Sequence, residues 1–344
     1  MKSCLSQTAL LPYNVKGKTM KAWQFKAYGP YHEVLKWSER ESPINRPDTA
    51  VVKTSAISLN FPDLLVCQGL YQVKAPLPAV PGVEGIGVVQ SAGPSSKFKV
   101  GDRVAGFCHG GGTLAEYFEV TNNSAWVVPD FVSNETGAAL SVTYGTSYFA
   151  LTHRAHLQAG ETLLVLGAAG GVGLAAIQLG KLMGATVIAA AGSQEKIDVC
   201  LNQGADHVVN YKSQNLVEEV NRITNGQRAD VIYDPVGGEL FEQTKRCLGW
   251  DGRLIIIGFA AGTIPTIETN RLLLKNAAII GLAWGQYMQR APEKAESCQK
   301  HLYQLLKIGA INPVIFQHLA FEDALEGMKV LESRKLYGKI VLSR

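Results

Sequence analysis

The spacing of apolar and polar residues changes along the chain and divides it into regions of different predicted structure. Between about residues 20 and 140, short apolar runs such as AVVKTSAISLN (50–60) alternate with glycine and proline turns. This pattern is typical of a compact β-rich domain. From residue 134, NETGAALSVTYGTSYFALTHRA has helical spacing, with Ser133 or Asn134 as a plausible N-cap. From residue 162 onward, apolar runs alternate with helical segments, which predicts a parallel sheet with helices on both faces.

The part of the chain after residue 162 contains a succession of expected strands and helices. The expected strands are 163–166, 186–191, 207–210, 229–237, 252–260, 277–284 and 337–342, and the expected helices are 193–203, 215–224, 240–248, 270–276 and 292–307. The last segment is expected to return to the β-rich part. We therefore predict a flexible extension over 1–19, a β-rich domain built from 20–143 and 286–344, and an α/β domain over 144–285.

The segment TLLVLGAAGGVG (162–173) is the centre of this organisation. A strand buried on both faces is predicted to end in a tight turn of small residues, and a helix follows it. Small residues let the backbone approach a pyrophosphate, which the free N–H groups of a helix N-terminus bind. An ordinary strand–turn–helix connection would read the same way in isolation. The candidate cofactor residues of the turn are Ala168, Gly170, Gly171, Val172 and Gly173.

The end of the second expected strand predicts which nicotinamide cofactor binds. Its sequence AAAGSQEK places no carboxylate where an acidic residue commonly binds the ribose 2′-hydroxyl. Ser193 and Lys196 follow, and a hydroxyl and an ammonium can bind a 2′-phosphate, so we favour NADPH over NADH. Alternatively, Ser193 only caps a helix and Lys196 is a solvated side chain. Tyr211 either lies beside the same phosphate or packs at the surface.

Composition and charge narrow the function classes. The 344 residues carry a net charge of +4 without a dense basic run, so nucleic acid is not an expected partner. Six scattered cysteines form no Cys-x-x-Cys pair, which favours a reducing cytoplasm over a disulfide framework. No apolar run reaches membrane-spanning length. The segment 1–19 is lysine-containing and acid-free, but it lacks the arginine and long apolar run of a targeting leader.

Several ordered motifs together resemble one protein family. The sequence is similar to the medium-chain dehydrogenase/reductase superfamily, in its zinc-free NADPH:quinone oxidoreductase subfamily. The resemblance covers residue 20 to the C-terminus and rests on MKAWQF (20–25), Asn60 with Asp63, GLY (69–71), PGVEGIGVV (81–89), GDRVAG (101–106), AAGGVG (168–173), DPVGG (234–238) and YGKIVL (337–342). It implies an α/β fold in which a β-rich GroES-like catalytic domain surrounds a Rossmann doubly wound domain, with NADPH in the cleft and a homodimeric assembly.

Departures from the alcohol dehydrogenase branch of this superfamily are equally informative. That branch carries a metal-binding His beside the Glu of the PGVEGIGVV-like motif, whereas Val83 precedes Glu84 here. It also places a Cys near the position of Asn60 and has a four-cysteine zinc lobe, and both are absent. A zinc site from His153, His156, Cys108 and His109 is the less favoured alternative to ordinary packing roles. We expect no metal.

The resemblance also implies where the acceptor binds. It places Asn60 and Tyr71 near the nicotinamide, as hydrogen-bond donors to a substrate oxygen. Alternatively, Asn60 caps the following turn and Tyr71 packs against the proline-rich connector. Thr146 either contacts the nicotinamide or caps a helix. Gly258 and Phe259 end a sheet strand, where ligands of such sheets gather.

These predictions converge on hydride chemistry without a Lewis acid. A quinone or enone can accept hydride at an activated carbon while hydrogen bonds stabilise the developing oxyanion. Two alternatives stay open: a 2-enoyl thioester reductase, and an NADPH-binding sensor or RNA-binding protein with little turnover. The apolar segment 277–284 suits an edge strand that pairs across a two-fold axis, or a strand buried within one chain.

Overall fold

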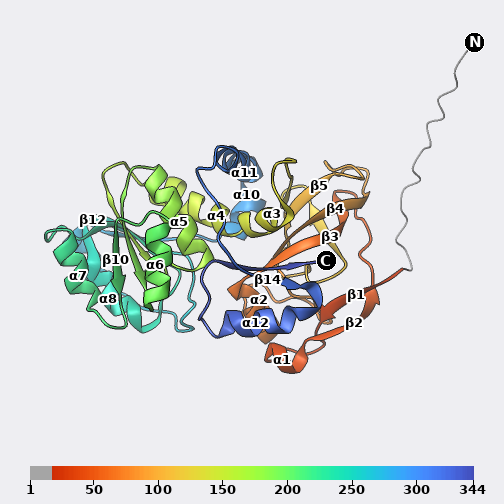
Figure 1. Ribbon diagram of the computed structural model, residues 1–344, viewed down its shortest axis with the longest axis horizontal. Helices are drawn as coiled ribbons and strands as arrows, with labels where there is room; N and C mark the ends of the chain where they lie inside the picture. Colours follow the sequence, from red (N-terminus) through yellow and green to blue (C-terminus); the bar gives the residue numbers. More distant parts are fainter. Residues whose placement is uncertain (1–17) are drawn as a thin grey trace, which may run out of the picture.

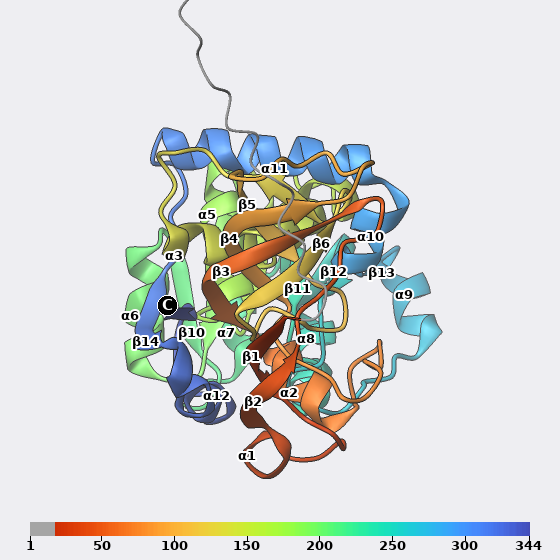
Figure 2. The ribbon, with the colours of Figure 1, turned by 90° about the vertical axis from the view of Figure 1, so that its right-hand side faces the viewer.

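Two sheets with different strand directions dominate the computed structural model, which describes residues 18–344. Figure 1 shows them side by side along the long axis, with α4 (Thr143–Phe149), α10 (Trp284–Arg290) and α11 (Pro292–Lys307) between them. Figure 2, turned by 90°, shows α11 along the top of the molecule, above β5 (Arg103–Phe107). This arrangement confirms the predicted α/β class with a parallel sheet and a separate β-rich sheet.

The six-stranded sheet is parallel throughout and matches the doubly wound order of dinucleotide-binding folds. Its strands, in spatial order, are β10 (His207–Asn210), β9 (Thr186–Ala191), β8 (Thr162–Leu166), β11 (Ala229–Asp234), β12 (Leu248–Ile256) and β13 (Ala278–Gly281). Alternate side chains of β8 enter different cores. Leu163 and Val165 pack with α5 (Gly171–Leu182), whereas Leu164 and Leu166 pack with α7 (Leu216–Ile223) and α8 (Phe241–Cys247).

The β-rich part contains a mainly antiparallel sheet, which the C-terminal segment completes with one parallel pair of strands. Its seven-stranded sheet has the order β14 (Ile315–Ala320), β15 (Lys339–Ser343), β3 (Thr49–Leu59), β4 (Glu84–Ala92), β5 and β7 (Ala125–Val127), and β6 (Tyr117–Thr121) pairs with β3. β1 (Thr19–Gln24) pairs with β2 (Lys36–Glu41). The remaining helices are α1 (Tyr31–Val34), α2 (Phe61–Gln68), α3 (Asn134–Leu140), α6 (Gln194–Asn202), α9 (Thr269–Lys275) and α12 (Ala324–Glu332). The chain end therefore packs against its beginning, as predicted.

Several segments differ from the sequence prediction. The strand expected over 229–237 ends at Asp234, and the strand expected over 252–260 runs from Leu248 to Ile256, so Gly258 and Phe259 lie in the loop after it. The single helix expected after residue 134 is divided into α3, α4 and a π-helical turn (Ala150–Arg154). In a continuous helix, the N–H of Val142 would donate to the C=O of Ala138. Here the Val142 N–H donates to Glu84 Oε2 at 2.9 Å, and the Ala138 C=O accepts from Ser58 Oγ at 2.9 Å, so the helix is interrupted at this point. The strand expected over 277–284 ends at Gly281, because Trp284 starts α10 and packs on Gly145 of α4.

The predicted domain limits remain predictions. Residues 1–17 of the expected extension lie outside the described residues, and β1 begins at Thr19. The limits at 143/144 and 285/286 fall inside α4 and α10. Helix α4 packs on α5, and α10 packs on α4 and α11, so these helices join the two sheets.

Candidate functional site

The glycine turn after β8 has the geometry of a pyrophosphate cradle. Gly167 has a φ of +54°, and Gly170 precedes α5 without a side-chain cap. The first N–H groups of a helix have no intrahelical acceptor, and at α5 they belong to Gly171, Val172 and Gly173. A Cβ at Gly173 would lie 2.5 Å from Ala168 O and 2.6 Å from Gly167 O. The residues therefore fit an anionic cofactor held by backbone donors.

Hydrogen bonds to β9 and α4 hold this turn in place. Ala168 is fully buried and donates its N–H to Ala190 O at 3.1 Å, which joins the ends of β8 and β9. Val172 C=O accepts from Ser147 Oγ of α4 at 2.8 Å. Thr146 is 8% exposed and lies inside α4, which begins at Thr143, so the alternative that Thr146 caps a helix is wrong. A contact between Thr146 and a nicotinamide stays a prediction.

The tip of β9 gathers polar and basic side chains from three parts of the chain. Ser193 caps α6, since its Oγ accepts from Lys196 N–H at 3.4 Å. Tyr211 lies beside the tip, because a Cβ at Gly192 would lie 3.1 Å from its hydroxyl oxygen. Lys196 Nζ donates to Arg334 C=O at 2.6 Å, so it is not simply a solvated side chain. Burial lowers the pKa of Lys196, and nearby Lys212 lowers it further.

Arg334 is the residue that sequence reasoning missed here. It follows α12, has a φ of +54°, and donates from its guanidinium to Ala260 C=O at 2.6 Å. The bond from Lys196 places Arg334 beside the tip of β9. Burial raises the pKa of Tyr211, and the positive charge of Arg334 opposes that shift. Nothing in the stretch ESRKLYG marks it as a ligand, because its neighbours in space are more than 70 residues away.

Gly258 and Phe259 lie at the carboxyl edge of the same sheet, directly after β12. A Cβ at Gly237, after β11, would lie 3.1 Å from Phe259 Cδ1, and a Cβ at Gly258 would lie 3.5 Å from Pro235 O. The two loops therefore pack on each other beside the glycine turn. Their contact with a nicotinamide stays a prediction.

Asn60 and Asp63 form a reciprocal capping box at the start of α2. Asn60 is 7% exposed, and its Nδ2 donates to Ser58 C=O at 3.1 Å and Glu84 Oε1 at 2.9 Å. Both amide hydrogens therefore have acceptors, and Asn60 would have to release one to donate to a substrate oxygen. Its structural role is clear, and its donor role stays a prediction.

Tyr71 lies beyond the end of α2 and is half-buried against the core that α2 shares with β1. Burial raises the pKa of its hydroxyl, and the nearby Asp63 carboxylate raises it further. The phenol therefore stays protonated and able to donate at neutral pH. Asn60 and Tyr71 are the two residues predicted to donate a hydrogen bond to the substrate. The Asn60 amide already has acceptors within the protein, so the Tyr71 hydroxyl is the more available donor.

Candidate metal ligands are dispersed. Within residues 18–344, no group of three or more His, Cys, Asp or Glu side chains could hold a metal ion. Cys108 Sγ donates to Glu119 C=O at 3.4 Å, and burial lowers the pKa of His109. Val83, at the position before Glu84, is 1% exposed.

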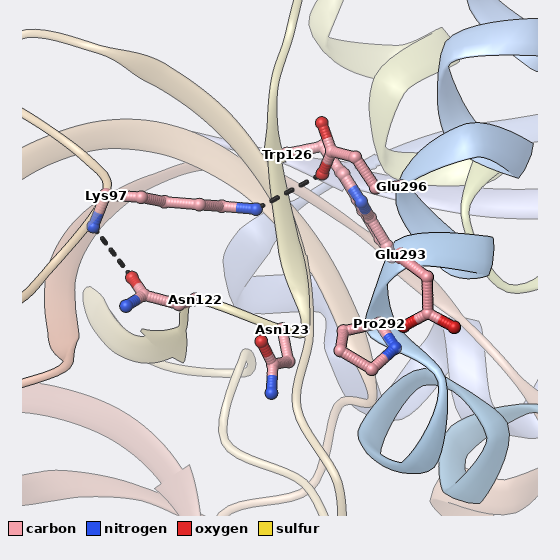
Figure 3. A pocket seen from close by; sticks show the side chains of 7 residues that line it. All are labelled: Lys97, Asn122, Asn123, Trp126, Pro292, Glu293 and Glu296. Atoms are coloured by element: carbon pink, nitrogen blue, oxygen red, sulfur yellow. Dashed lines mark hydrogen bonds and ion pairs between the residues drawn. The ribbon is translucent and has the colours of Figure 1, made fainter.

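A pocket of about 330 Å³ lies outside this region, between the β-rich part and α11 (Figure 3). Lys97 Nζ reaches across it to Glu296 Oε2 at 3.3 Å. The residues that line it are Lys97, Asn122, Asn123, Trp126, Pro292, Glu293 and Glu296, and none is a predicted cofactor or acceptor residue.

None of the helices in residues 18–344 combines the length and the apolar character that a membrane span requires.

Comparisons with known proteins agree with this fold. Residues 46–130 match the alcohol dehydrogenase GroES-like domain, and residues 171–300 match the zinc-binding dehydrogenase domain. Quinone oxidoreductase-like protein 2 of Bos taurus is 40% identical over 301 residues, which cover 87% of this chain and 86% of that protein.

Solved structures extend the likeness to the whole fold. The quinone oxidoreductase of Pseudomonas syringae pv. Tomato DC3000 superposes with a TM-score of 0.87 at 29% identity, over 94% of this chain and all of that one. The Escherichia coli quinone oxidoreductase, solved as a complex with NADPH, superposes with a TM-score of 0.84 at 28% identity, over 95% of this chain and all of that one.

Proposed function

The chain belongs to the medium-chain dehydrogenase/reductase superfamily, in its quinone oxidoreductase subfamily, and from this premise we propose that it is an NADPH-dependent reductase of quinones or other α,β-unsaturated carbonyl compounds. It is an oxidoreductase that binds a nicotinamide cofactor. NADPH as the preferred form, and the acceptor class, are the parts that we propose.

One observation carries the proposal: a backbone cradle and a basic cluster lie at the ends of adjacent strands. The uncapped start of α5 follows β8, whereas Ser193, Lys196, Tyr211 and Arg334 surround the tip of β9. The first suits a pyrophosphate and the second a 2′-phosphate. When bound there, NADPH supplies the hydride.

On the acceptor side, we propose that Tyr71 donates a hydrogen bond to the carbonyl oxygen of the substrate. A donor aimed at an oxygen that gains negative charge stabilises the transition state. Val83 replaces the neighbouring imidazole of the zinc-dependent branch, and Glu84 is bonded to Lys339 at 3.0 Å. We therefore propose that a hydrogen bond, rather than a metal ion, polarises the carbonyl group of the substrate. After hydride transfer, water protonates the product.

The acceptor class is tested with a panel of quinones, enones and enoyl thioesters, each offered with NADPH or NADH. Turnover of quinones or enones with a preference for NADPH supports the proposal. Turnover restricted to enoyl thioesters would reassign the acceptor. Tight NADPH binding without turnover of any acceptor would contradict the enzymatic proposal and favour a sensing role.

Replacing Lys196 with alanine is expected to raise the Kd for NADPH about tenfold and to leave the Kd for NADH unchanged. The lost interaction is a charge-assisted hydrogen bond to the 2′-phosphate, which contributes about 1.5 kcal/mol. Fluorescence titration with both cofactors measures the effect. Lys181→Ala is the matched control, because Lys181 pairs with Asp206 at the far end of α5. An equal loss of NADH affinity in the Lys196 variant would contradict the phosphate role.

The homodimer that the resemblance implies is proposed to form along β13. This strand lies at the edge of the six-stranded sheet, and the adjacent α9 exposes Leu273 and Leu274 at 76% and 73%. Unpaired strand edges pair readily with a second copy. Ile280→Lys is expected to shift the protein from twice the chain mass to the chain mass in light scattering. The exposed Ile308 provides the control Ile308→Lys, and a dimer in both variants would place the interface elsewhere.

A further inference from the structure

A buried lysine near the chain end joins the two sides of the proposed site. Lys339 lies on β15 and is 5% exposed. Its Nζ donates to Leu59 C=O at 2.9 Å, to Asn60 Oδ1 at 2.5 Å and to Glu84 Oε1 at 3.0 Å. An ammonium has three hydrogens, so this set uses all of them.

The carboxylate of Glu84 extends the connection toward the dinucleotide-binding sheet. Its Oε1 also accepts from Ser58 Oγ at 2.6 Å and from Asn60 Nδ2 at 2.9 Å. Its Oε2 accepts the N–H of Val142, directly before α4, and α4 packs on α5. Glu84 therefore bonds to both the acceptor side and the support of the cofactor turn.

The methylene stem of Lys339 reaches the cofactor turn itself. A Cβ at Gly171, the first residue of α5, would lie 2.7 Å from Lys339 Cδ. The preceding residue, Gly338, donates its N–H to Ala169 C=O at 2.8 Å. One side chain thus contacts the start of α5 with its stem and the amide of Asn60 with its ammonium.

We propose that Lys339, paired with Glu84, is a positioning residue that sets the distance and orientation between the cofactor turn and the acceptor side. This inference rests on the proposed reductase function. Lys339 can only donate and the Glu84 carboxylate only accepts, so they fix the Asn60 amide with Oδ1 toward Lys339 and Nδ2 toward Glu84. Hydride transfer depends steeply on such alignment, and a displacement of about 1 Å can cost about 100-fold in rate.

The pair is a poor choice for stability alone. Desolvation offsets the attraction of a buried ion pair, so an apolar pair of similar volume is often as stable. Lys339 and Glu84 nevertheless make five bonds to three other parts of the chain: β3, the N-cap of α2 and the residue before α4. A positioning role explains why directional bonds occupy this place.

The test uses Lys339→Met and the double variant Glu84→Gln/Lys339→Met. We expect Lys339→Met to lower kcat at least about tenfold while the Kd for NADPH changes less than about threefold. The deuterium isotope effect on kcat with NADPH labelled at the transferred position should rise, because hydride transfer becomes more rate-limiting. The double variant leaves no lone buried charge, so it should regain thermal stability but keep the low kcat.

Two controls separate positioning from stability. Lys245→Met removes another buried ammonium, whose side chain is 3% exposed and pairs with Glu242, and should leave kcat and the isotope effect unchanged. Ser58→Ala is the second control. It removes one bond to Glu84 but keeps the bonds of the Asn60 amide, so kcat and the isotope effect should again match those of the wild-type protein. Wild-type kcat in Lys339→Met, or a kcat that recovers with stability in the double variant, would overturn the proposal.

A readout without turnover separates this proposal from the proposed function. If the wild-type protein reduces no acceptor, the reductase function fails. The connection is then judged by amide hydrogen exchange at Val142, whose N–H donates to Glu84, and at Leu174, whose N–H donates to Gly170 C=O at the start of α5. Faster exchange at both in Lys339→Met, but not in Lys245→Met, supports a link between the two sides, and unchanged exchange overturns it.

Discussion

Gly173→Ala is expected to weaken NADPH binding about 1,000-fold. The new Cβ would lie 2.5 Å from Ala168 O and 2.6 Å from Gly167 O, and both atoms are backbone that cannot rotate away. The turn must shift, and the first N–H groups of α5 then lose their alignment with the pyrophosphate. Two or three hydrogen bonds to a charged group contribute about 1.5–3 kcal/mol each, which is consistent with a loss of about 4 kcal/mol.

Fluorescence titration and isothermal calorimetry measure this loss, and circular dichroism reports whether the fold persists. Gly281→Ala is the matched control, because a Cβ there would meet no atom within 4 Å in the same sheet. Its NADPH affinity should equal that of the wild-type protein. An affinity within about threefold of wild type in Gly173→Ala would mean that the pyrophosphate does not bind at this turn.

The parallel sheet could be predicted because local patterns determine it. Strand β8 is a continuous apolar run that ends in small residues, and β9 and β10 begin and end as the apolar pattern predicts. The helix after residue 134 could not be predicted in detail, because its break at Val142 depends on Glu84, which lies 58 residues earlier in the chain. Likewise, Trp284 ends the strand-like run because it packs on Gly145.

The candidate site could be predicted only where one short segment contains it. The glycine turn and the tip of β9 are local, so Gly173, Ser193 and Lys196 could be named from the sequence. Arg334 and Lys339 could not, because their roles arise from contacts with segments 74 to 280 residues away along the chain. The bonds of Asn60 were equally hidden, since Glu84 and Lys339 meet it only in the folded chain.

Asp63 should make the protein less stable as the pH rises from about 4 to about 7. The carboxyl group is fully buried at the start of α2, where it accepts from Asn60 N–H at 2.8 Å and Gly82 N–H at 3.1 Å. Burial raises its pKa to about 7, and the two N–H groups and Lys339 only partly oppose this shift. In the unfolded chain its pKa is about 3.9.

The direction of the effect follows from the protons bound. Between pH 4 and 7 the folded protein keeps a proton on Asp63 that the unfolded chain releases, so raising the pH favours unfolding. Each pKa unit corresponds to about 1.4 kcal/mol, which gives a loss of about 4 kcal/mol across this range and no further loss above it.

Asp63→Asn should remove most of this pH dependence, because an amide does not titrate. The amide also offers one acceptor oxygen where the carboxyl group serves two N–H groups, so one buried donor loses its partner at a cost of about 1–3 kcal/mol at every pH. Urea unfolding at several pH values measures both effects. Asp130→Asn, at an exposed aspartate, should keep the wild-type slope. The same slope in Asp63→Asn as in the wild-type protein would show that the buried carboxyl group is ionised throughout, held by its N–H donors and Lys339 against the cost of desolvation.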